Sequence, residues 1–215
     1  MVHINAKIAQ VYKAAEGLEI HVLVHQPDKL LLSKHPGEEL ELGLEDGRMI
    51  TPAQRRKIYA TLKDISDHTG YTPEAAKQIM KVEHMLRTEN TEMFSLSDCS
   101  VSTAREFINT LMEYALCEGI ILSGIALERT DDIDTYLYQC LKYKRCCICG
   151  RDAEVHHVDA IGMGNNRLLV DDSMHRKVSL CRLHHSIAHQ NGWKRFAAQY
   201  KIYGIRYNEE AEKLA

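Results

Sequence analysis

The sequence CCICGRDAEVHHVDAIG of Cys146–Gly162, followed after a loop by HRKVSLCRLHHSIAH of His175–His189, decides the fold of the C-terminal part of the chain. Residues 146–189 hold four of the seven cysteines and six of the twelve histidines. Thiolate and imidazole groups are the ligands that proteins commonly use for zinc and other transition metals. The clustering therefore predicts that this stretch binds metal.

The spacing of these residues separates them into two sets. Cys146 and Cys149 form a CxxC pair, and Cys181 and His184 form a CxxH pair. Paired two-residue gaps of this kind are typical of a structural zinc site, in which each tight turn delivers two ligands. These four residues are therefore predicted to hold a structural Zn²⁺, with Cys147 as a bystander thiol.

The second set consists of His156 and His157, adjacent in sequence, and of His185 and His189, four residues apart. On a helix, residues at positions i and i+4 lie on the same face, so the imidazoles of His185 and His189 would point to the same place. On a strand, neighbouring side chains point to opposite faces, so His156 and His157 can serve one site only if the strand twists or ends there.

Together these motifs resemble the HNH, or ββα-metal, nuclease family in its zinc-ribbon form, over roughly residues 140–205. The resemblance implies hydrolysis of DNA phosphodiester bonds by an endonuclease. It also implies that His156, His185 and His189 bind a catalytic divalent cation (Mg²⁺, Mn²⁺ or Zn²⁺) and that His157 is the general base. Such a reaction needs a cation at the departing oxygen and a base for the attacking water, and free imidazole titrates near pH ~6.5.

Two assignments stay open at this stage. His175 lies where the family usually has Asn, so we assign it the middle catalytic role, but a shift of one residue would give that place to Arg176. Relatives more often have cysteine at the position of His184. Either His184 completes the zinc site and His185 serves catalysis, which we favour because it keeps the CxxH spacing, or the two histidines exchange roles.

A purely structural interpretation competes with catalysis. All of these ligands could instead hold a zinc finger that adds affinity for DNA without cleaving it. Four-ligand zinc shells would leave His157 and His175 without a purpose. A nuclease is therefore the favoured hypothesis, and a non-catalytic mediator of recombination that binds single-stranded DNA is the alternative.

Charge is distributed unevenly along the 215 residues, whose formal net charge is −3. Residues 1–140 contain 14 Lys/Arg against 22 Asp/Glu, whereas residues 141–207 contain 12 against 5. A positive module on an acidic carrier fits a C-terminal domain that binds phosphates. The residues expected to grip phosphates near the site are Arg167, Arg176, Lys177 and Arg182.

The N-terminal part is expected to begin with a small antiparallel sheet and to continue with helices. Alternating apolar residues predict strands at 6–13 and 18–25, joined by a turn at Glu16-Gly17, and a further strand at 40–44. Helices are predicted to start at Thr51-Pro52, at Thr72-Pro73 and near Ser102, the last reaching Cys117. A short helix is predicted at 136–144 and an amphipathic helix at 193–203. The fold class is therefore α+β.

Residues 18–120, which include ELGLEDGRMITPAQRRKIYATLKDIS and STAREFINTLMEYALCEGI, are similar to the NinB or Orf family of phage recombination proteins. That resemblance implies binding of single-stranded or branched DNA during phage recombination or replication, and a homodimer. The DNA-binding residues it implies are Arg48, Arg55, Arg56 and Lys57. The same charges could simply be exposed in the first turn of a helix.

These observations predict the following organisation: a recombination or DNA-binding domain at 1–130, a connector at 131–140, an HNH nuclease domain at 141–207 and an acidic tail at 208–215. No uncharged apolar run approaches the roughly 18–20 residues needed to cross a membrane. The N-terminus lacks a basic and then apolar leader. A cytoplasmic location is expected, in the bacterial host if a phage encodes the chain.

Overall fold

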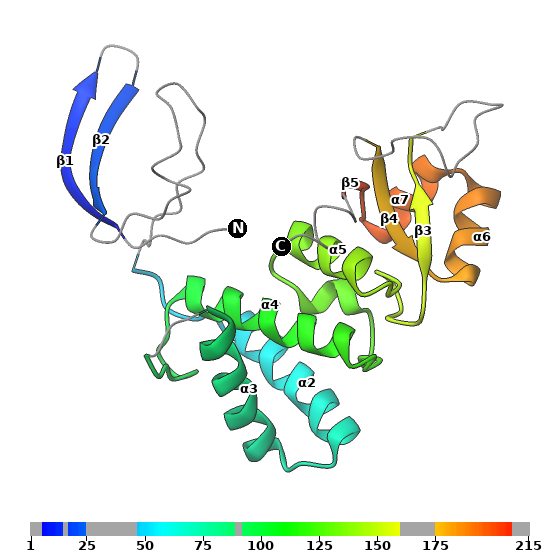
Figure 1. Ribbon diagram of the computed structural model, residues 1–215, viewed down its shortest axis with the longest axis horizontal. Helices are drawn as coiled ribbons and strands as arrows, with labels where there is room; N and C mark the ends of the chain where they lie inside the picture. Colours follow the sequence, from blue (N-terminus) through cyan, green and yellow to red (C-terminus); the bar gives the residue numbers. More distant parts are fainter. Residues whose placement is uncertain (1–5, 15–16, 25–46, 89–91, 160–174, 208–215) are drawn as a thin grey trace. The chain divides into compact units, whose positions relative to one another are not determined.

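A computed structural model describes residues 6–14, 17–24, 47–88, 92–159 and 175–207. The chain divides into two compact units, residues 1–44 and 45–215. The first unit contains strands β1 (Ala6–Ala14) and β2 (Gly17–Val24), which pair antiparallel with Ala14 opposite Gly17 (Figure 1). The two strands predicted at 6–13 and 18–25 are thus confirmed. The strand predicted at 40–44 lies outside the described residues.

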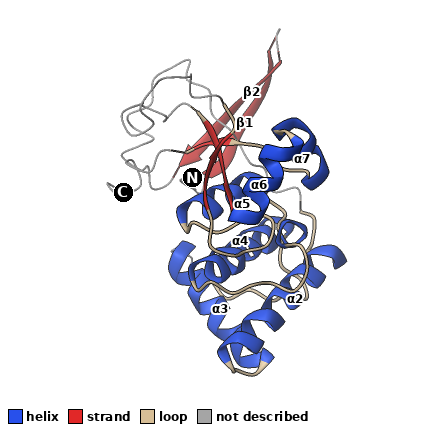
Figure 2. Cartoon of the chain, turned by 90° about the vertical axis from the view of Figure 1, so that its right-hand side faces the viewer, coloured by secondary structure: helices blue, strands red, loops and turns tan. Residues whose placement is uncertain are grey.

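The second unit begins with three packed helices, α2 (Pro52–Thr69), α3 (Pro73–Thr88) and α4 (Val101–Cys117) (Figure 2). The predicted start of α2 is confirmed: Thr51 Oγ1 accepts a hydrogen bond from the Gln54 backbone N–H, and the Gln54 side chain bonds back to the Thr51 N–H. This capping box satisfies two N–H groups that a helix leaves unpaired. Ser100 caps α4 in a similar way through the Thr103 N–H.

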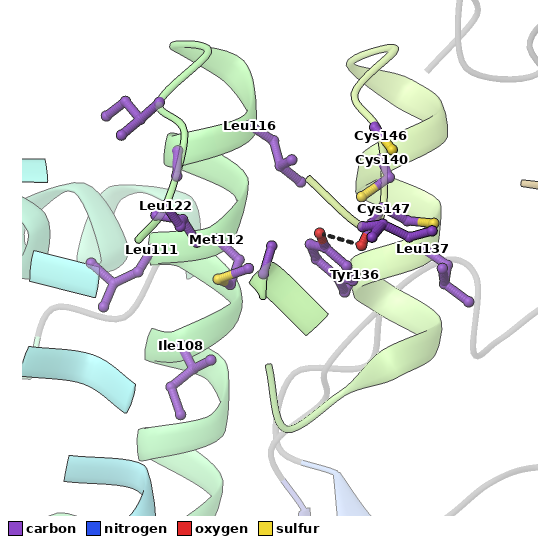
Figure 3. Close-up of a cluster of buried hydrophobic side chains, with 14 of the residues drawn as sticks. Ile108, Leu111, Met112, Leu116, Leu122, Tyr136, Leu137, Cys140, Cys146 and Cys147 are labelled. Atoms are coloured by element: carbon purple, nitrogen blue, oxygen red, sulfur yellow. Dashed lines mark hydrogen bonds between the residues drawn. The ribbon is translucent and has the colours of Figure 1, made fainter. Parts of the chain in front are cut away.

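A 3₁₀ turn, η1 (Ala126–Arg129), and helix α5 (Ile133–Lys142) lead from the three helices to the metal-ligand motifs. Helix α5 starts three residues before the predicted position because the Asp132 carboxylate accepts a hydrogen bond from the Thr135 N–H and so caps the helix earlier. Tyr136 on α5 is fully buried and donates a hydrogen bond to the Cys147 carbonyl over 3.0 Å (Figure 3). This hydrogen bond links helix α5 to the cysteine turn.

The C-terminal part contains a three-stranded antiparallel sheet and two helices. Its strands are β3 (Glu154–His157), β4 (Arg176–Leu180) and β5 (Ile205–Arg206), with β4 in the middle. Helices α6 (Arg182–Asn191) and α7 (Trp193–Tyr200) follow β4, and both α5 and α6 pack against that strand. Strand β5 was not predicted, because two residues give too short a pattern to recognise.

One buried cluster runs through the second unit, from Ile58 and Phe107 in the helices to Cys146, Leu180 and Phe196 beside the sheet. The predicted boundaries at 130 and 140 fall inside this packed unit and stay a prediction. The predicted α+β class is confirmed. Among the helices of the described ranges, we find none with the length and apolar character that a membrane crossing needs.

Candidate metal centres

The first cluster joins a turn to the start of a helix. Cys146 and Cys149 lie on a turn closed by the hydrogen bond from the Gly150 N–H to the Cys146 carbonyl. Cys181 is the N-cap of α6, and His184 lies in its first turn. The ligand atoms of these four residues lie within 4.8 Å of one another.

Distances within this Cys₃His cluster are close to those between the ligands of a tetrahedral zinc ion. His184 Nδ1 lies 3.4 Å from Cys146 Sγ and 3.2 Å from Cys181 Sγ, and the Cys149 and Cys181 sulfurs are 3.7 Å apart. Zn–S bonds of about 2.3 Å and Zn–N bonds of about 2.0 Å give ligand-to-ligand edges of about 3.5–3.8 Å in a tetrahedron. The distance between the two sulfurs lies within this range, and the two distances to His184 are slightly shorter, so these four residues could hold Zn²⁺.

The thiols of this cluster differ in their electrostatic surroundings. Burial raises the pKa of Cys146 to about 12. Burial also acts to raise the pKa of Cys181, but the backbone N–H groups at the start of α6 and the neighbouring thiols outweigh it and lower the pKa. A helix N-terminus favours a thiolate in this way. Cys147 is fully buried and belongs to neither ligand group of the described residues.

The second cluster joins strand β3 to helix α6. Its members are His156, which is 5% exposed, and His185 and His189, which lie one turn apart on the helix. The ring centroids are 4.8 Å apart for His156 and His185, 5.0 Å for His156 and His189, and 4.7 Å for His185 and His189. Their candidate ligand atoms lie within 4.8 Å of one another. The structure thus brings together the three histidines that the sequence assigns to the catalytic cation.

His156 has the environment of a metal ligand. Its Nδ1 is buried and has no hydrogen-bond partner among the described residues, which is costly unless another group supplies one. The indole of Trp193 lies over the ring at 5.4 Å with the planes tilted by 30°. Burial, followed by the nearby imidazoles of His185, His189 and His157, lowers the pKa of His156 to about 4. His156 is therefore neutral at pH 7, the form that binds a cation.

Glu154 also belongs to this three-histidine cluster, although the sequence analysis did not single it out. Its Oε1 lies 2.6 Å from Nδ1 of His185. That hydrogen bond and the nearby imidazole lower the pKa of Glu154, although the carboxylate itself is largely exposed. The signal that could have found it is the alternation of the strand, which places residues 154 and 156 on the same face.

His157 is the last residue of β3 and lies opposite Lys177 in the sheet. The strand therefore ends at His157, which is one of the two conditions, a twist or an end, under which His156 and His157 could serve one site. The candidate ligand group contains His156 but not His157, so the role of His157 as the base stays a prediction. His175 immediately precedes β4 and has a buried Nδ1 without a hydrogen-bond partner among the described residues. Arg176, the other candidate for the middle role, forms an ion pair with Asp159 in which their closest atoms are 2.6 Å apart.

Lys177 lies differently from what the sequence analysis expected. Its side chain is buried at 6% exposure, and its Nζ donates a hydrogen bond to the Tyr207 carbonyl over 3.1 Å. The ammonium thus helps to hold the segment after β5 and is not placed to contact a phosphate on the surface. Arg182 is exposed on the first turn of α6, and Arg167 lies outside the described residues.

The basic residues at the start of α2 are largely engaged within the chain. Arg55 donates to the Ser97 carbonyl over 2.7 Å, and Lys57 binds both Asp131 and the Thr130 carbonyl at 2.5 Å. Arg56 is exposed. Cations in the first turn of a helix are disfavoured by the helix dipole, but acceptors elsewhere in the fold compensate here. The positions of Arg55 and Lys57 can therefore be explained without a contact to DNA.

Strands β3 and β4 and helix α6 form a strand-strand-helix unit. Histidines from its first strand and its helix converge in this unit, beside the Cys₃His cluster. Comparison with known families agrees: a family model described as "Putative HNHc nuclease" matches residues 20–215. The chain belongs to this HNH nuclease family. The search of curated proteins and the search of solved structures returned no match.

Proposed function

We propose that this chain is a metal-dependent DNA endonuclease that hydrolyses phosphodiester bonds at the three-histidine cluster. The observation that carries the proposal is the convergence of His156, His185 and His189 next to His157, at the point where β3 ends. The membership of the chain in a nuclease family supports the same conclusion. The site needs three neutral imidazoles, and the unpartnered nitrogen of His156 is available for a cation.

Each residue of the site has a separate task in this proposal. His157 accepts a proton from the attacking water, and His175 orients that base or binds the metal. When bound by His156, His185 and His189, a divalent cation would supply electrostatic stabilisation of the leaving oxygen. Imidazole ligands bind Zn²⁺ more tightly than Mn²⁺ or Mg²⁺, but affinity alone does not decide which metal a site carries in the cell, so all three cations are candidates. We assign a structural Zn²⁺ to the Cys₃His cluster, which forms the zinc-ribbon part of the fold.

Membership in the family does not specify which form of DNA is cleaved. We propose single-stranded or branched DNA from phage recombination or replication, on the basis of the resemblance of residues 18–120 to the recombination family. Exposed Arg56 and Arg182 are retained as candidates for phosphate contacts. The homodimer and the intracellular location in a bacterial host are proposals of the same kind.

The decisive experiment is the nicking of supercoiled plasmid by His157→Ala. The variant is expected to keep its fold and metal content but to lose cleavage in Mg²⁺ or Mn²⁺ by at least about 100-fold, the scale of general base catalysis. His68→Ala, which changes an exposed histidine at the end of α2, is the matched control and should cleave normally. Undiminished cleavage by His157→Ala would remove His157 as the base.

A non-catalytic DNA-binding protein is the second candidate, favoured by the tight Cys₃His geometry, which by itself would stabilise a binding module. A panel of junction, flap, single-stranded and linear DNAs separates the two candidates. Binding without cleavage in all tested cations by the wild-type protein would support the binding module and contradict the endonuclease.

A further inference from the structure

Gly204 immediately precedes β5, in the segment that leads from α7 back to the sheet. Its φ angle lies outside the left-handed region that favours glycine, so the backbone conformation does not require a glycine here. The space around it does, because a Cβ atom at this position would lie 2.6 Å from Cγ2 of Val158 and 3.0 Å from Cβ of Arg176. Carbon atoms in contact are normally about 3.5–4.0 Å apart, so a side chain here would have to displace a neighbour.

The two residues that Gly204 approaches each follow a candidate catalytic histidine. Val158 follows His157, the candidate base, and Arg176 follows His175. The Val158 N–H donates a hydrogen bond to the Arg176 carbonyl over 2.8 Å, which joins the segment after β3 to the start of β4. Gly204 therefore packs against the place where the chain passes from both histidines into this joint.

The segment that contains Gly204 is anchored on both sides. Before it, Ile202 is buried at 4% exposure. After it, Ile205 pairs with Lys177 of β4, and the Lys177 Nζ donates a hydrogen bond to the carbonyl of buried Tyr207 over 3.1 Å. The segment cannot swing outward without breaking these contacts. A side chain at residue 204 would therefore push on the opposing strand ends.

We infer that Gly204 is a positioning residue of the proposed nuclease site. Because it has no side chain, the C-terminal segment packs closely on the ends of β3 and β4 and so fixes where His157 and His175 lie. A misplacement of about 1 Å in a catalytic arrangement can cost about 100-fold in rate. The inference rests on the proposed function, because it concerns the same two histidines.

A contribution to folding stability alone is the competing explanation for this close packing. That explanation predicts that a side chain at residue 204 lowers stability but leaves cleavage by the folded protein unchanged. A positioning role predicts slower cleavage with unchanged cation binding, because the ligands His185 and His189 lie on α6 and not at the strand ends. It also predicts recovery when space is made for the added side chain.

The test uses full-length protein whose Cys₃His cluster is loaded with zinc, and it follows the nicking of supercoiled plasmid in Mn²⁺. Gly204→Val is expected to lower kcat by about 10–100-fold, and Gly204→Ala by less, because its side chain is smaller. Calorimetric titration of Co²⁺ should give an affinity within about twofold of the wild-type value for both variants, since the three ligands are retained.

A second substitution tests the contact itself. Val158→Ala removes Cγ2, the atom closest to the added Cβ. Combined with Gly204→Ala, it should recover most of the lost cleavage when the double variant is compared with Val158→Ala alone. Ile58→Val is the control for lost stability: it removes a methylene from a fully buried residue of α2 and should cleave normally.

A measurement without cleavage makes the test specific. Nitrogen-15 NMR of the histidine rings, recorded before Mn²⁺ or Co²⁺ is added, should show shifted ring signals for His157 and His175 in Gly204→Ala. These signals should return toward their positions in Val158→Ala when both substitutions are present. Ile58→Val should leave them at their wild-type positions.

The outcomes distinguish the inference from the proposed function. If the wild-type protein cleaves no DNA in any cation, the proposed function is wrong, and the inference falls with it. If the wild-type protein cleaves and both Gly204 variants cleave equally well with unchanged ring signals, only the inference is wrong. Slow cleavage that Val158→Ala does not relieve, or an equal loss in Ile58→Val, would assign the effect to stability and also overturn the inference.

Discussion

The two clusters of this protein receive adjacent residues of one helix yet differ in nearly every physical property. The Cys₃His cluster joins a turn to the N-terminus of α6, and Cys146 and Cys181 belong to the continuous hydrophobic core. The three-histidine cluster joins a strand to the same helix, but His189 is exposed, and the largely exposed carboxylate of Glu154 contacts His185. One cluster is closed by the fold, and the other opens to solvent.

The difference teaches how a small domain separates stability from chemistry. Four protein ligands in a closed tetrahedron leave no coordination position for a substrate. Three ligands with an open side leave one position free. His184 and His185 are neighbours, but successive helix residues are rotated by about 100°, so each faces a different cluster. The following predictions test this division, beginning with the largest expected effect.

Removing a ligand from the closed cluster should unfold much of the second unit. Cys149→Ser is expected to lose about one zinc ion per chain and several kcal/mol of stability, because structural zinc in small domains contributes about 10 kcal/mol or more to folding. Metal analysis and thermal unfolding followed by circular dichroism measure both effects. Cys117→Ser, at an exposed cysteine, is the control. An unchanged zinc content would contradict the assignment.

Removing a ligand from the open cluster should affect binding of the second ion and little else. His189→Ala is expected to keep one zinc ion per chain and to change stability by less than about 0.5 kcal/mol, as exposed substitutions usually do. Co²⁺ affinity should fall by about 100-fold or more. It is measured by calorimetric titration of Co²⁺ into protein whose Cys₃His cluster is loaded with zinc. Gln190→Ala, the exposed neighbour on α6, should bind Co²⁺ normally. Loss of the zinc in His189→Ala would show that the two clusters are not independent.

The clusters should also differ in their dependence on pH. Burial raises the pKa of Cys146 to about 12, so this thiol is protonated at pH 7 and must release its proton to bind zinc. The pKa of His156 is lowered to about 4, chiefly by burial, so this imidazole releases none above about pH 5. Zinc affinity of the closed cluster should therefore rise more steeply with pH. Calorimetry in buffers of different ionisation enthalpy counts the protons, and equal counts for both clusters would refute the distinction.

The smallest expected effect concerns the contact between α5 and the cysteine turn. Tyr136→Phe removes the hydroxyl that donates to the Cys147 carbonyl and should cost about 1 kcal/mol, the usual contribution of one hydrogen bond. Zinc and Co²⁺ binding should be unchanged, because the phenyl ring still fills the core. Denaturant unfolding measures the loss, with Tyr138→Phe on the exposed side of α5 as control. A change in zinc content would instead tie this hydroxyl to the ligand turn.

Local signals predicted the helices and strands well where a cap or an alternating pattern was present. Thr51 and Pro52 marked the start of α2, and alternation identified β1 and β2. Helix α5 starts earlier than the sequence pattern predicts because Asp132 caps it, and β5 gives no recognisable pattern because it has two residues. Lys177 was expected at the surface, because a lysine in a short strand gives no local sign of burial against a carbonyl 30 residues later.

The sequence by itself determined the chemical types and spacings of the candidate metal ligands, and with them the family to which the chain belongs. Only the tertiary structure decided that His184 lies with the cysteines and His185 with the other histidines, and that Glu154 faces His185. The physical reason is that spacing fixes which side chains can share a face of one element. The packing of a helix against a strand fixes which faces meet.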